Sequence, residues 1–222
     1  VFLFLFIYKT KRGSLQGEEY LKRERDLSEV VGRFKKLISM KNYSDGNFLK
    51  NLMGFESQGA VKYWNYVRLL LADDGIAFEE RIGHKAIDLV NCMLNYGYAI
   101  LYSRACQALL YAQLNPYDSV IHVRQAGKPT FSFDFIELFR SQAVDRVIIS
   151  MLQKGEEAEV KDGKLTDATK NNLIRNLTER MYKYELYRGE STMFENVIRK
   201  QAKEIADYFS DGKPYKPYKA KW

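Results

Sequence analysis

The stretch that decides the fold is IDLVNCMLNYGYAILYSRACQALLYAQL, residues 87–114. Apolar side chains recur at helical spacing along it, from Val90 through Tyr98 to Leu109, and its other faces are also largely apolar. A helix that is apolar on every side is typical of the centre of a helical domain. Pro116 ends it, because a proline disfavours helix in the residue before it. The stretch therefore predicts a central buried helix on which other helices pack.

Amphipathic segments flank this central helix on both sides, and their apolar residues follow the helical period. The other segments expected to form helices are 17–40, 47–53, 55–72, 134–153, 167–186 and a last one that starts at STMFE, 191–195. In the last, Ser191 or Thr192 would cap the helix and Glu195 would close a capping box. No repeat or clear linker interrupts the series. We therefore expect an all-α fold, a single helical catalytic domain of about six to eight helices, with at most a short N-terminal strand.

The composition is that of a folded protein. With 222 residues, 46% of them hydrophobic and only four prolines, the chain is able to bury a real core. Its net charge of +7 favours a polyanionic partner without specifying one. Cys92 and Cys106 are fourteen residues apart on one expected helix, which is about 21 Å and too far for a disulfide. We expect free thiols in a reducing compartment.

The first eight residues, VFLFLFIY, are apolar but too few to span a bilayer, which needs about 20. They lack the basic residues before and the small-residue cleavage site after that a signal peptide has. Because the chain does not begin with Met, we expect it to start inside a longer one. We assign residues 1–16 to a strand-like N-terminal remnant or linker, 17–212 to the helical domain, and 213–222 to a basic, aromatic C-terminal tail.

A second stretch, VIHVRQAGKPTFSFDFIELF (120–139), holds His122, one of the two histidines, and then Asp134 and Glu137. One interpretation is a helix start, since Asp-x-x-Glu before an apolar run is the pattern of a capping box. The other is half of a metal site. Residues three apart on a helix share a face, where two carboxylates crowd unless a cation lies between them. A turn marked by glycine and proline would fold His122 back onto that face, and this set of ligands suits Mg²⁺ or Mn²⁺.

A third ligand would strengthen the metal interpretation. Glu56 is a single acid among the apolar and small residues of LMGFESQGAVKYW (52–64). An acid near a helix N-terminus is often only a surface residue that the helix dipole favours. The small neighbours Gly54 and Gly59, however, leave room for the close approach of another backbone or a substrate.

Four blocks of the chain, in order, resemble the CRISPR-associated spacer-acquisition integrase and endonuclease family, the universal integrase that inserts new spacers into the array. The blocks are LMGFESQGAVKYW (52–64), DLVNCMLNYGYAILYSR (88–104), FSFDFIELFRSQAVDRVI (131–148) and IRKQAKEIADYFSDGKPYKPY (198–218). The resemblance covers roughly residues 20–222 and corresponds to the helical C-terminal catalytic domain of that family.

Matched residue by residue, the resemblance implies Glu56, His122 and Glu137 as the catalytic ligands of Mg²⁺ or Mn²⁺, with Asp134 beside them as a further metal-binding or supporting acid. Whether Asp134 binds the ion or caps the helix stays open. Two features depart from the family pattern. We expect the N-terminal β-rich domain that dimerises family members to be missing or shortened here. In addition, SVIH (119–122) stands where the family commonly has a Gly-Phe-Leu-His run.

The reaction that the resemblance implies is a transesterification, in which a DNA 3′-hydroxyl attacks a phosphodiester of the repeat without a covalent enzyme intermediate. The implied partners are double-stranded DNA (the spacer precursor and the CRISPR repeat and leader), further copies of the chain in a dimer or tetramer, and a small ferredoxin-like adaptation protein. The implied setting is antiviral defence in the prokaryotic cytoplasm.

Basic residues near these blocks are expected to grip DNA phosphates. The candidates are Lys62, Arg104, Arg124, Lys128 and Arg140, with Arg68 and Arg146 as further ones. Each is also explained as a solvated surface charge. The tail KPYKPYKAKW (213–222) alternates lysine with aromatic residues, a mixture that contacts phosphates and stacks on bases. It is equally explained by aromatics that pack back on the domain.

Two hypotheses compete with a metal-dependent integrase. The first is a non-catalytic helical DNA-binding or scaffold subunit, in which the three expected ligands are only helix caps and surface residues. The second is a related integrase of a mobile element that shares the fold. All three ligand types stand in the expected blocks, which favours an enzyme over a scaffold.

Overall fold

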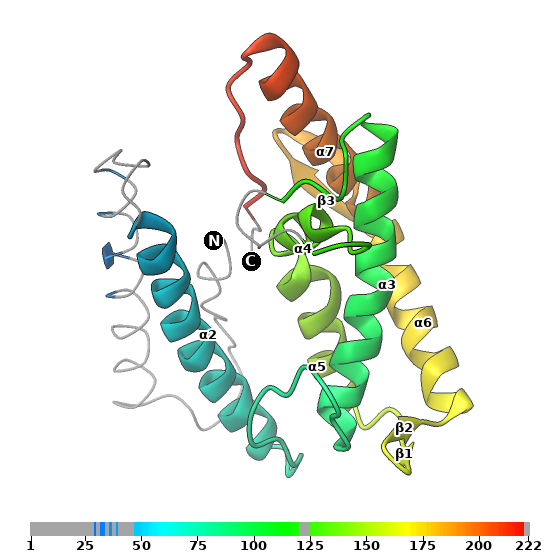
Figure 1. Cartoon of the computed structure of the whole chain (residues 1–222). Helices are drawn as coiled ribbons and strands as arrows, with labels where there is room; N and C mark the ends of the chain where they lie inside the picture. The colour runs from blue at the N-terminus through cyan, green and yellow to red at the C-terminus, as the bar shows by residue number, and fades with distance from the viewer. Residues whose placement is uncertain are drawn as a thin grey trace. The chain divides into compact units, whose positions relative to one another are not determined.

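The computed structural model describes residues 47–119 and 125–219, together with five isolated helical positions before residue 47. The helix expected at 17–40, the N-terminal strand and the end of the tail lie largely outside the described residues. In order, the described elements are α2 (Phe48–Ala72), α3 (Leu89–Tyr111), α4 (Thr130–Ile136), the π-helical segment η2 (Ser141–Asp145), α5 (Arg146–Gln153), β1 (Val160–Lys161), β2 (Lys164–Leu165), α6 (Asp167–Tyr182), β3 (Tyr184–Tyr187), β4 (Glu190–Met193) and α7 (Phe194–Asp211) (Figure 1).

The chain is mostly helical, as the sequence predicts, and it divides into two compact units. One unit comprises residues 1–82 with 221–222, and the other comprises residues 83–220. In the first, the two helices expected at 47–53 and 55–72 are one continuous helix, α2. The segment that follows α2 returns along it, because Phe78 packs against Trp64 with ring centroids 5.9 Å apart. The guanidinium of Arg81 also lies 5.9 Å from the Trp64 ring.

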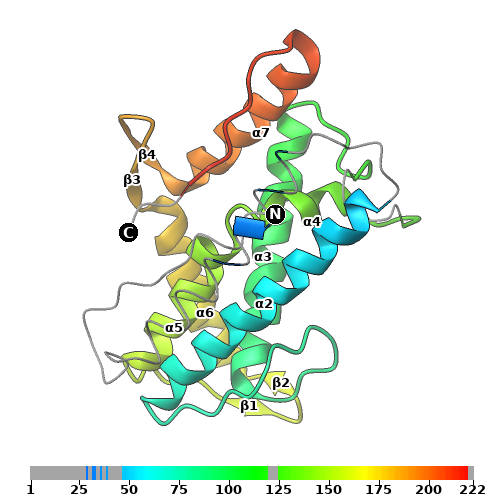
Figure 2. The ribbon, with the colours of Figure 1, turned by 90° about the vertical axis from the view of Figure 1, so that its left-hand side faces the viewer.

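The second unit is built around α3, which confirms the central buried helix. Leu101, Ala105 and Leu109 on α3 are fully buried, and the helix contacts α4, η2, α5, α6 and α7. Figures 1 and 2 show these elements arranged along the length of α3. The Asp88 carboxylate caps the first turn by accepting from the Asn91 amide at 2.9 Å. Cys92 and Cys106 are both free thiols, as their spacing predicts.

A glycine lets η2 approach α3 closely. A Cβ on Gly97 would lie 2.6 Å from Cγ1 of Val144, which is shorter than any normal contact. Both residues are buried, so the Val144 side chain has little room to turn away. Gly97 therefore brings η2, and the turn before it, against the central helix.

The single helix expected at 134–153 is three pieces. Helix α4 begins at Thr130 and ends at Ile136, a turn follows, and η2 then leads into α5. In η2 the amide of Arg146 donates to the carbonyl of Ser141, five residues back. Such π-helical turns are rare and are frequent at functional sites.

Two β-hairpins occur where the sequence predicts no strand, one between the expected helices 134–153 and 167–186 and the other from the end of the latter into the start of the last helix. β1 pairs with β2 and β3 with β4, both antiparallel. Each hairpin turns through two residues with positive φ, Asp162–Gly163 and Arg188–Gly189, which is the conformation of a type I′ turn. Helix α6 therefore ends at Tyr182 instead of 186. The capping box expected at the start of the last helix is wrong, since α7 follows β4 directly and Met193 provides no side-chain cap. Among the described helices, none is long and apolar enough to cross a membrane.

Candidate active site

The segment that leads into α4 is tied to its surroundings at both ends. Thr130 Oγ1 donates to the carbonyl of Tyr117 at 3.1 Å, and the amide of Phe131 donates to the carbonyl of Pro116 at 2.9 Å. The hydroxyl of Tyr102 on α3 donates to the carbonyl of Pro129 at 3.0 Å. These bonds fix the start of α4 against the end of α3, on either side of the segment that contains His122.

Asp134 does not cap α4, which corrects the capping-box interpretation. The helix begins four residues earlier, its N-cap position is Pro129, and that cap has no side-chain hydrogen bond. Asp134 lies inside the helix, where its Oδ2 accepts from the hydroxyl of Ser119 at 2.7 Å. Ser119 precedes His122 by three residues in the sequence. Asp134 therefore ties the start of the histidine segment to α4.

Glu137 lies where α4 ends and is 11% exposed. Its Oε1 accepts a hydrogen bond from Nη1 of Arg140, one turn further on. Its Oε2 is buried and has no hydrogen-bond partner among the described residues. A buried carboxylate oxygen without a partner is costly. Oε2 is thus the atom through which Glu137 would bind a further group.

Arg140 is itself held by residues of α3 and η2. Its guanidinium lies 4.1 Å from the ring centroid of Tyr98, a cation–π contact, and the Tyr98 hydroxyl donates to Oδ1 of Asp145. Tyr98 and Asp145 are both buried. Burial by itself lowers the pKa of Arg140, but Tyr98, Glu137 and Asp145 together raise that pKa above its ordinary value. The guanidinium therefore stays charged and fixes one side of the Glu137 carboxylate.

Tyr98 and Asp145 support this site, and neither is among the site residues predicted from the sequence. Tyr98 was assigned to the core by its helical spacing, and it is indeed buried. The signal that was available is the acid of the 131–148 block, Asp145, placed among apolar residues. A buried acid requires a partner, but the sequence does not say which residue supplies it.

Glu56 lies in the first unit, more than two turns inside α2. The helix dipole acts mainly within the first turn, so the simpler explanation of Glu56, an acid near a helix N-terminus, does not apply. The side chain is partly exposed. A Cβ on Gly54, one half-turn before it, would meet no other atom within 4 Å. No described atom therefore occupies the space beside Gly54, whereas Gly59, the other small neighbour of Glu56, is buried.

The three expected ligands fall in different parts of the chain. Glu56 belongs to the first unit, Glu137 to the second, and His122 lies outside the described residues. Among the residues that the structure describes, no three His, Cys, Asp or Glu side chains lie together as a metal site. Their assembly into one site stays a prediction. The donor set itself, two carboxylates and an imidazole, suits Mg²⁺ or Mn²⁺.

The expected DNA contacts differ in how far they are free to bind phosphate. Lys128 is exposed in a turn in which its amide donates to the carbonyl of Gln125 at 3.1 Å, with Gly127 at positive φ. Arg104 forms an ion pair with Glu195 at 3.2 Å, and Arg140 faces Glu137 and Tyr98. Lys62, Arg68 and Arg146 lie on α2 and α5. Arg124 lies outside the described residues.

In the described residues 213–219 of the tail, the tyrosines pack back on the second unit. Of the two explanations of these tyrosines, packing on the domain is therefore the one that the structure shows. Tyr218 is buried against Phe139, Phe194 and Tyr187, with ring centroids 5.7, 5.9 and 6.5 Å away. The lysines of the tail are exposed. Aromatic stacking on bases is therefore not available to Tyr218, while phosphate contacts remain available to the lysines.

Comparison with known proteins gives one consistent family. The family model described as CRISPR associated protein Cas1 matches residues 7–179. A CRISPR-associated endonuclease Cas1 of Archaeoglobus fulgidus is 30% identical over 185 residues, which are 78% of this chain and 53% of the relative. One of Francisella tularensis subsp. novicida is 28% identical over 96% of this chain and 65% of the relative. The chain thus spans about half to two thirds of the length of these relatives.

Solved structures share the fold. A CAS1 protein from Thermotoga maritima aligns with a TM-score of 0.72 and 17% identity, over 86% of this chain and 60% of that one. A casposase bound to an integration product aligns with a TM-score of 0.68 and 20% identity, over 87% and 55%. A chain of a Cas6-RT-Cas1–Cas2 complex aligns with a TM-score of 0.67 and 20% identity, over 89% and 22%.

Proposed function

Because the chain belongs to the CRISPR associated protein Cas1 family, we propose that it is a metal-dependent integrase and endonuclease of CRISPR adaptation. It joins the 3′-OH ends of spacer DNA to the repeat by transesterification, and its metal ligands are Glu56, His122 and Glu137. The coarser part of the proposal, a DNA nuclease or integrase, is supported by the names of the relatives.

The observation that carries the proposal is the Glu137 carboxylate. One of its oxygens is held by Arg140, and the other is buried without a partner among the described residues. Most buried carboxylate oxygens in folded proteins have a hydrogen-bond partner, and among the described residues Oε1 of Glu185 is the other exception. The arrangement at Glu137 resembles a metal ligand, whose orientation is set by a hydrogen bond to a second residue.

Each residue of the site has a defined task in this proposal. Arg140, fixed by Tyr98 and through it by Asp145, orients Glu137. Asp134 holds Ser119, and with it the start of the segment that carries His122. Lys128, exposed in the turn before α4, contacts a DNA phosphate. When bound, Mg²⁺ or Mn²⁺ offsets charge on the phosphodiester and lowers the pKa of the attacking hydroxyl.

The partners follow from the relatives and are part of the proposal. A casposase that shares the fold was solved with an integration product, which supports DNA strand joining as the reaction class. Another chain with this fold is part of a Cas6-RT-Cas1–Cas2 complex. We therefore expect double-stranded DNA, further copies of the chain and a small Cas2-type protein as partners.

Strand transfer tests the proposal directly. The protein is incubated with labelled 3′-OH duplexes and a supercoiled plasmid that carries a repeat, with Mn²⁺, with Mg²⁺ or with a chelator. We expect label in the plasmid only when a divalent ion is present. Glu56→Ala should lose the product, because one of three ligands is removed.

The matched control is Glu79→Ala, which removes an exposed acid from the same unit and should leave the product at the wild-type level. Product from Glu56→Ala that equals the wild type would overturn the ligand assignment. Product from the wild type in the presence of the chelator would overturn the metal dependence.

A further inference from the structure

The described part of the tail has a three-residue period. It reads KPYKPYK, with lysines at 213, 216 and 219, prolines at 214 and 217, and tyrosines at 215 and 218. Residues 212–219 form neither helix nor strand. A chain with this proline content favours the polyproline II conformation, which repeats every three residues and rises about 3.1 Å per residue. Residues of one kind then share one edge, about 9 Å apart.

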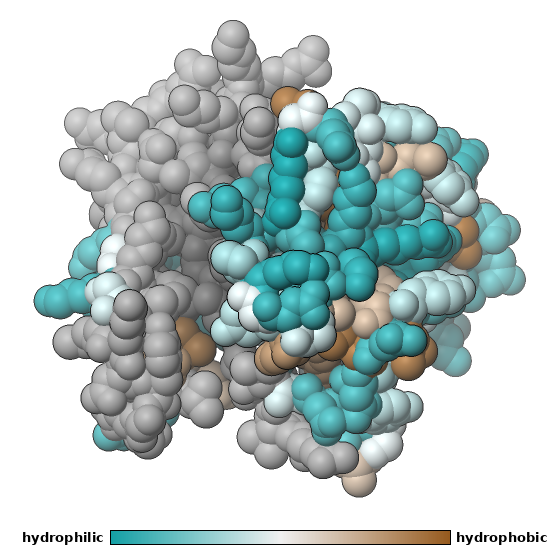
Figure 3. Space-filling view, turned by 90° about the horizontal axis from the view of Figure 1, so that it is seen from above, coloured by the Kyte–Doolittle hydropathy of each residue, from teal (hydrophilic) through white to brown (hydrophobic). Residues whose placement is uncertain are grey.

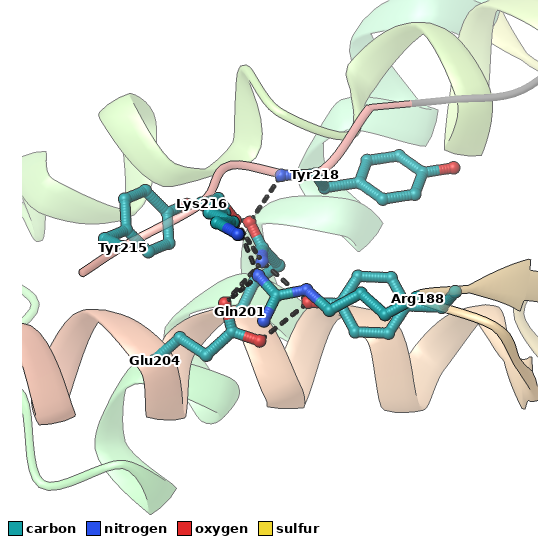
Figure 4. Close-up of polar contacts among 7 residues, drawn as sticks. Arg188, Gln201, Glu204, Tyr215, Lys216 and Tyr218 are labelled. Atoms are coloured by element: carbon teal, nitrogen blue, oxygen red, sulfur yellow. Dashed lines mark hydrogen bonds and ion pairs between the residues drawn. The ribbon is translucent and has the colours of Figure 1, made fainter. Parts of the chain in front are cut away.

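A buried glutamine holds the backbone of this segment (Figure 4). Gln201 on α7 is fully buried, and its carboxamide bonds the tail as a neighbouring strand would. Nε2 donates to the carbonyl of Lys216 at 3.1 Å, and Oε1 accepts from the amide of Tyr218 at 2.6 Å. Arg188 donates to the same Lys216 carbonyl at 2.9 Å. These contacts involve the main chain of the tail, so they fix its register.

The tyrosines turn the other edge of the tail inwards. Tyr215 donates its hydroxyl to Oε1 of Gln201 at 2.8 Å, and Tyr218 is buried among aromatic rings. Both side chains therefore point to the body of the unit, while Lys213, Lys216 and Lys219 are exposed. The tail thus presents lysines from a backbone that is already ordered.

Two of the three described tail lysines differ from the other lysines of this region, which are held in ion pairs. Lys213 forms an ion pair with Asp211 at 2.6 Å. On α7, Lys200 and Lys203 pair with Glu190 and Asp207. Lys216 and Lys219 form no ion pair with any residue that the structure describes. The upper end of the second unit, where the tail lies in Figure 1, is largely hydrophilic in Figure 3.

We propose that Lys216 and Lys219 form a DNA-backbone contact outside the reaction centre, on a tail that Gln201 holds in place. The proposal rests on the proposed function, since it assigns a further surface for the same DNA. It favours nucleic acid because the two lysines are regularly spaced, positive and exposed, which suits the phosphates of a DNA backbone. An ordered backbone lowers the entropy lost when the lysines bind.

The test is the salt dependence of DNA binding. Affinity for a short duplex is measured by fluorescence anisotropy between about 50 and 200 mM salt, with a chelator present so that no strand is cut. Each lysine–phosphate contact contributes about 0.9 to the slope of log affinity against log salt. We therefore expect Lys216→Gln/Lys219→Gln to lower the slope by about two and to weaken binding at low salt most.

The control variant is Lys154→Gln/Lys164→Gln, which removes the same charge from two exposed lysines near the β1–β2 hairpin. It should keep the wild-type slope. An unchanged slope in the tail variant, or an equal loss in the control, would overturn the tail contact. Failure of the wild-type protein to bind DNA at all would instead overturn the proposed function.

Gln201→Ala tests the part played by the ordered tail. It keeps both lysines, so the salt slope should stay within about half a unit of the wild type. Binding should nevertheless weaken several-fold at every salt concentration, because the tail must then be ordered on binding. All variants are compared below their thermal unfolding transitions. If Gln201→Ala bound DNA as tightly as the wild type, the hydrogen bonds between Gln201 and the tail would have no part in DNA binding.

Discussion

The ring of Tyr218 stacks on the ring of Phe139, with centroids 5.7 Å apart and planes inclined by 29°. Phe139 is fully buried, follows Glu137 by two residues and directly precedes Arg140. The C-terminal tail therefore packs on the same turn that carries the candidate metal ligand. The tail, Glu137 and Arg140 therefore belong to one packed group within the second unit.

We expect Tyr218→Ala to lower the free energy of unfolding by about 2 to 4 kcal/mol, because it removes a buried aromatic ring from a packed cluster. Tyr218→Phe keeps the ring and should retain most of the stability. Urea unfolding measures both. Phe209→Ala is the control, since Phe209 is 64% exposed and its loss should change the unfolding free energy by less than about 0.5 kcal/mol. Equal effects at the two positions would contradict the packing of the tail.

The two simplest substitutions of Glu137 should differ in stability but not in activity. Glu137→Ala removes the acceptor of the partly buried Arg140 and leaves that charge without its partner. We expect a loss of about 1 to 3 kcal/mol in the free energy of unfolding. Glu137→Gln keeps an acceptor and should lose less. Strand transfer should be abolished in both. A fully stable Glu137→Ala would show that the ion pair does not support the turn.

Stability should fall at alkaline pH. Burial raises the pKa of Tyr102 to about 12, and the charges of Cys106 and Tyr117 act in the same direction. Burial also raises the pKa of Tyr187 to about 12. An unfolded tyrosine loses its proton near pH 10. The stability that these groups contribute is therefore complete below about pH 10 and is lost as pH rises towards about 12.

Tyr102→Phe isolates one part of this dependence. It should cost about 1 kcal/mol at neutral pH, because the hydrogen bond to the Pro129 carbonyl is lost. Its unfolding free energy should then fall less steeply than that of the wild type above pH 10. Urea unfolding at a series of pH values gives both quantities, and an equally steep fall would contradict the role assigned to Tyr102.

Among the basic residues near the site, Lys128 should act mainly on DNA affinity. It is exposed in its turn, so Lys128→Gln should lower the salt slope of DNA binding by about one and leave thermal stability unchanged. Arg104→Gln should in addition lower thermal stability, because it also breaks the ion pair with Glu195. The same anisotropy titration measures both variants. No change in slope for Lys128→Gln would remove it from the DNA surface.

Much of the fold was predictable because it depends on local periodicity. The central helix α3 is largely apolar on all its faces. Asp88 marks its beginning, and Pro116 marks its end. The hairpins were missed although Asp162–Gly163 is a strong turn signal. The strands of that hairpin are only two residues long. They are too short to show the alternation of apolar and polar residues that predicts a strand.

The ligands of the site stay a prediction from the sequence, and its supports were not predicted at all. Residue types and the family resemblance suggested Glu137, and the structure adds the unpartnered Oε2. The role of Asp134 depends on where α4 begins, and contacts between segments distant in the sequence determine that position. Thr130 starts the helix because it bonds to Tyr117, and no local pattern reveals that bond. Gln201 gave no signal either, because its partners belong to a segment some fifteen residues away.

The most direct test of the central claim is Mn²⁺ binding, followed by the electron paramagnetic resonance of the free ion. We predict that the wild-type protein binds Mn²⁺ and that Glu137→Gln binds it at least about tenfold more weakly, because the buried oxygen is a ligand. Glu179→Gln, which changes an exposed acid on α6, should bind as the wild type does. Equal Mn²⁺ affinity in Glu137→Gln and the wild type would contradict the account.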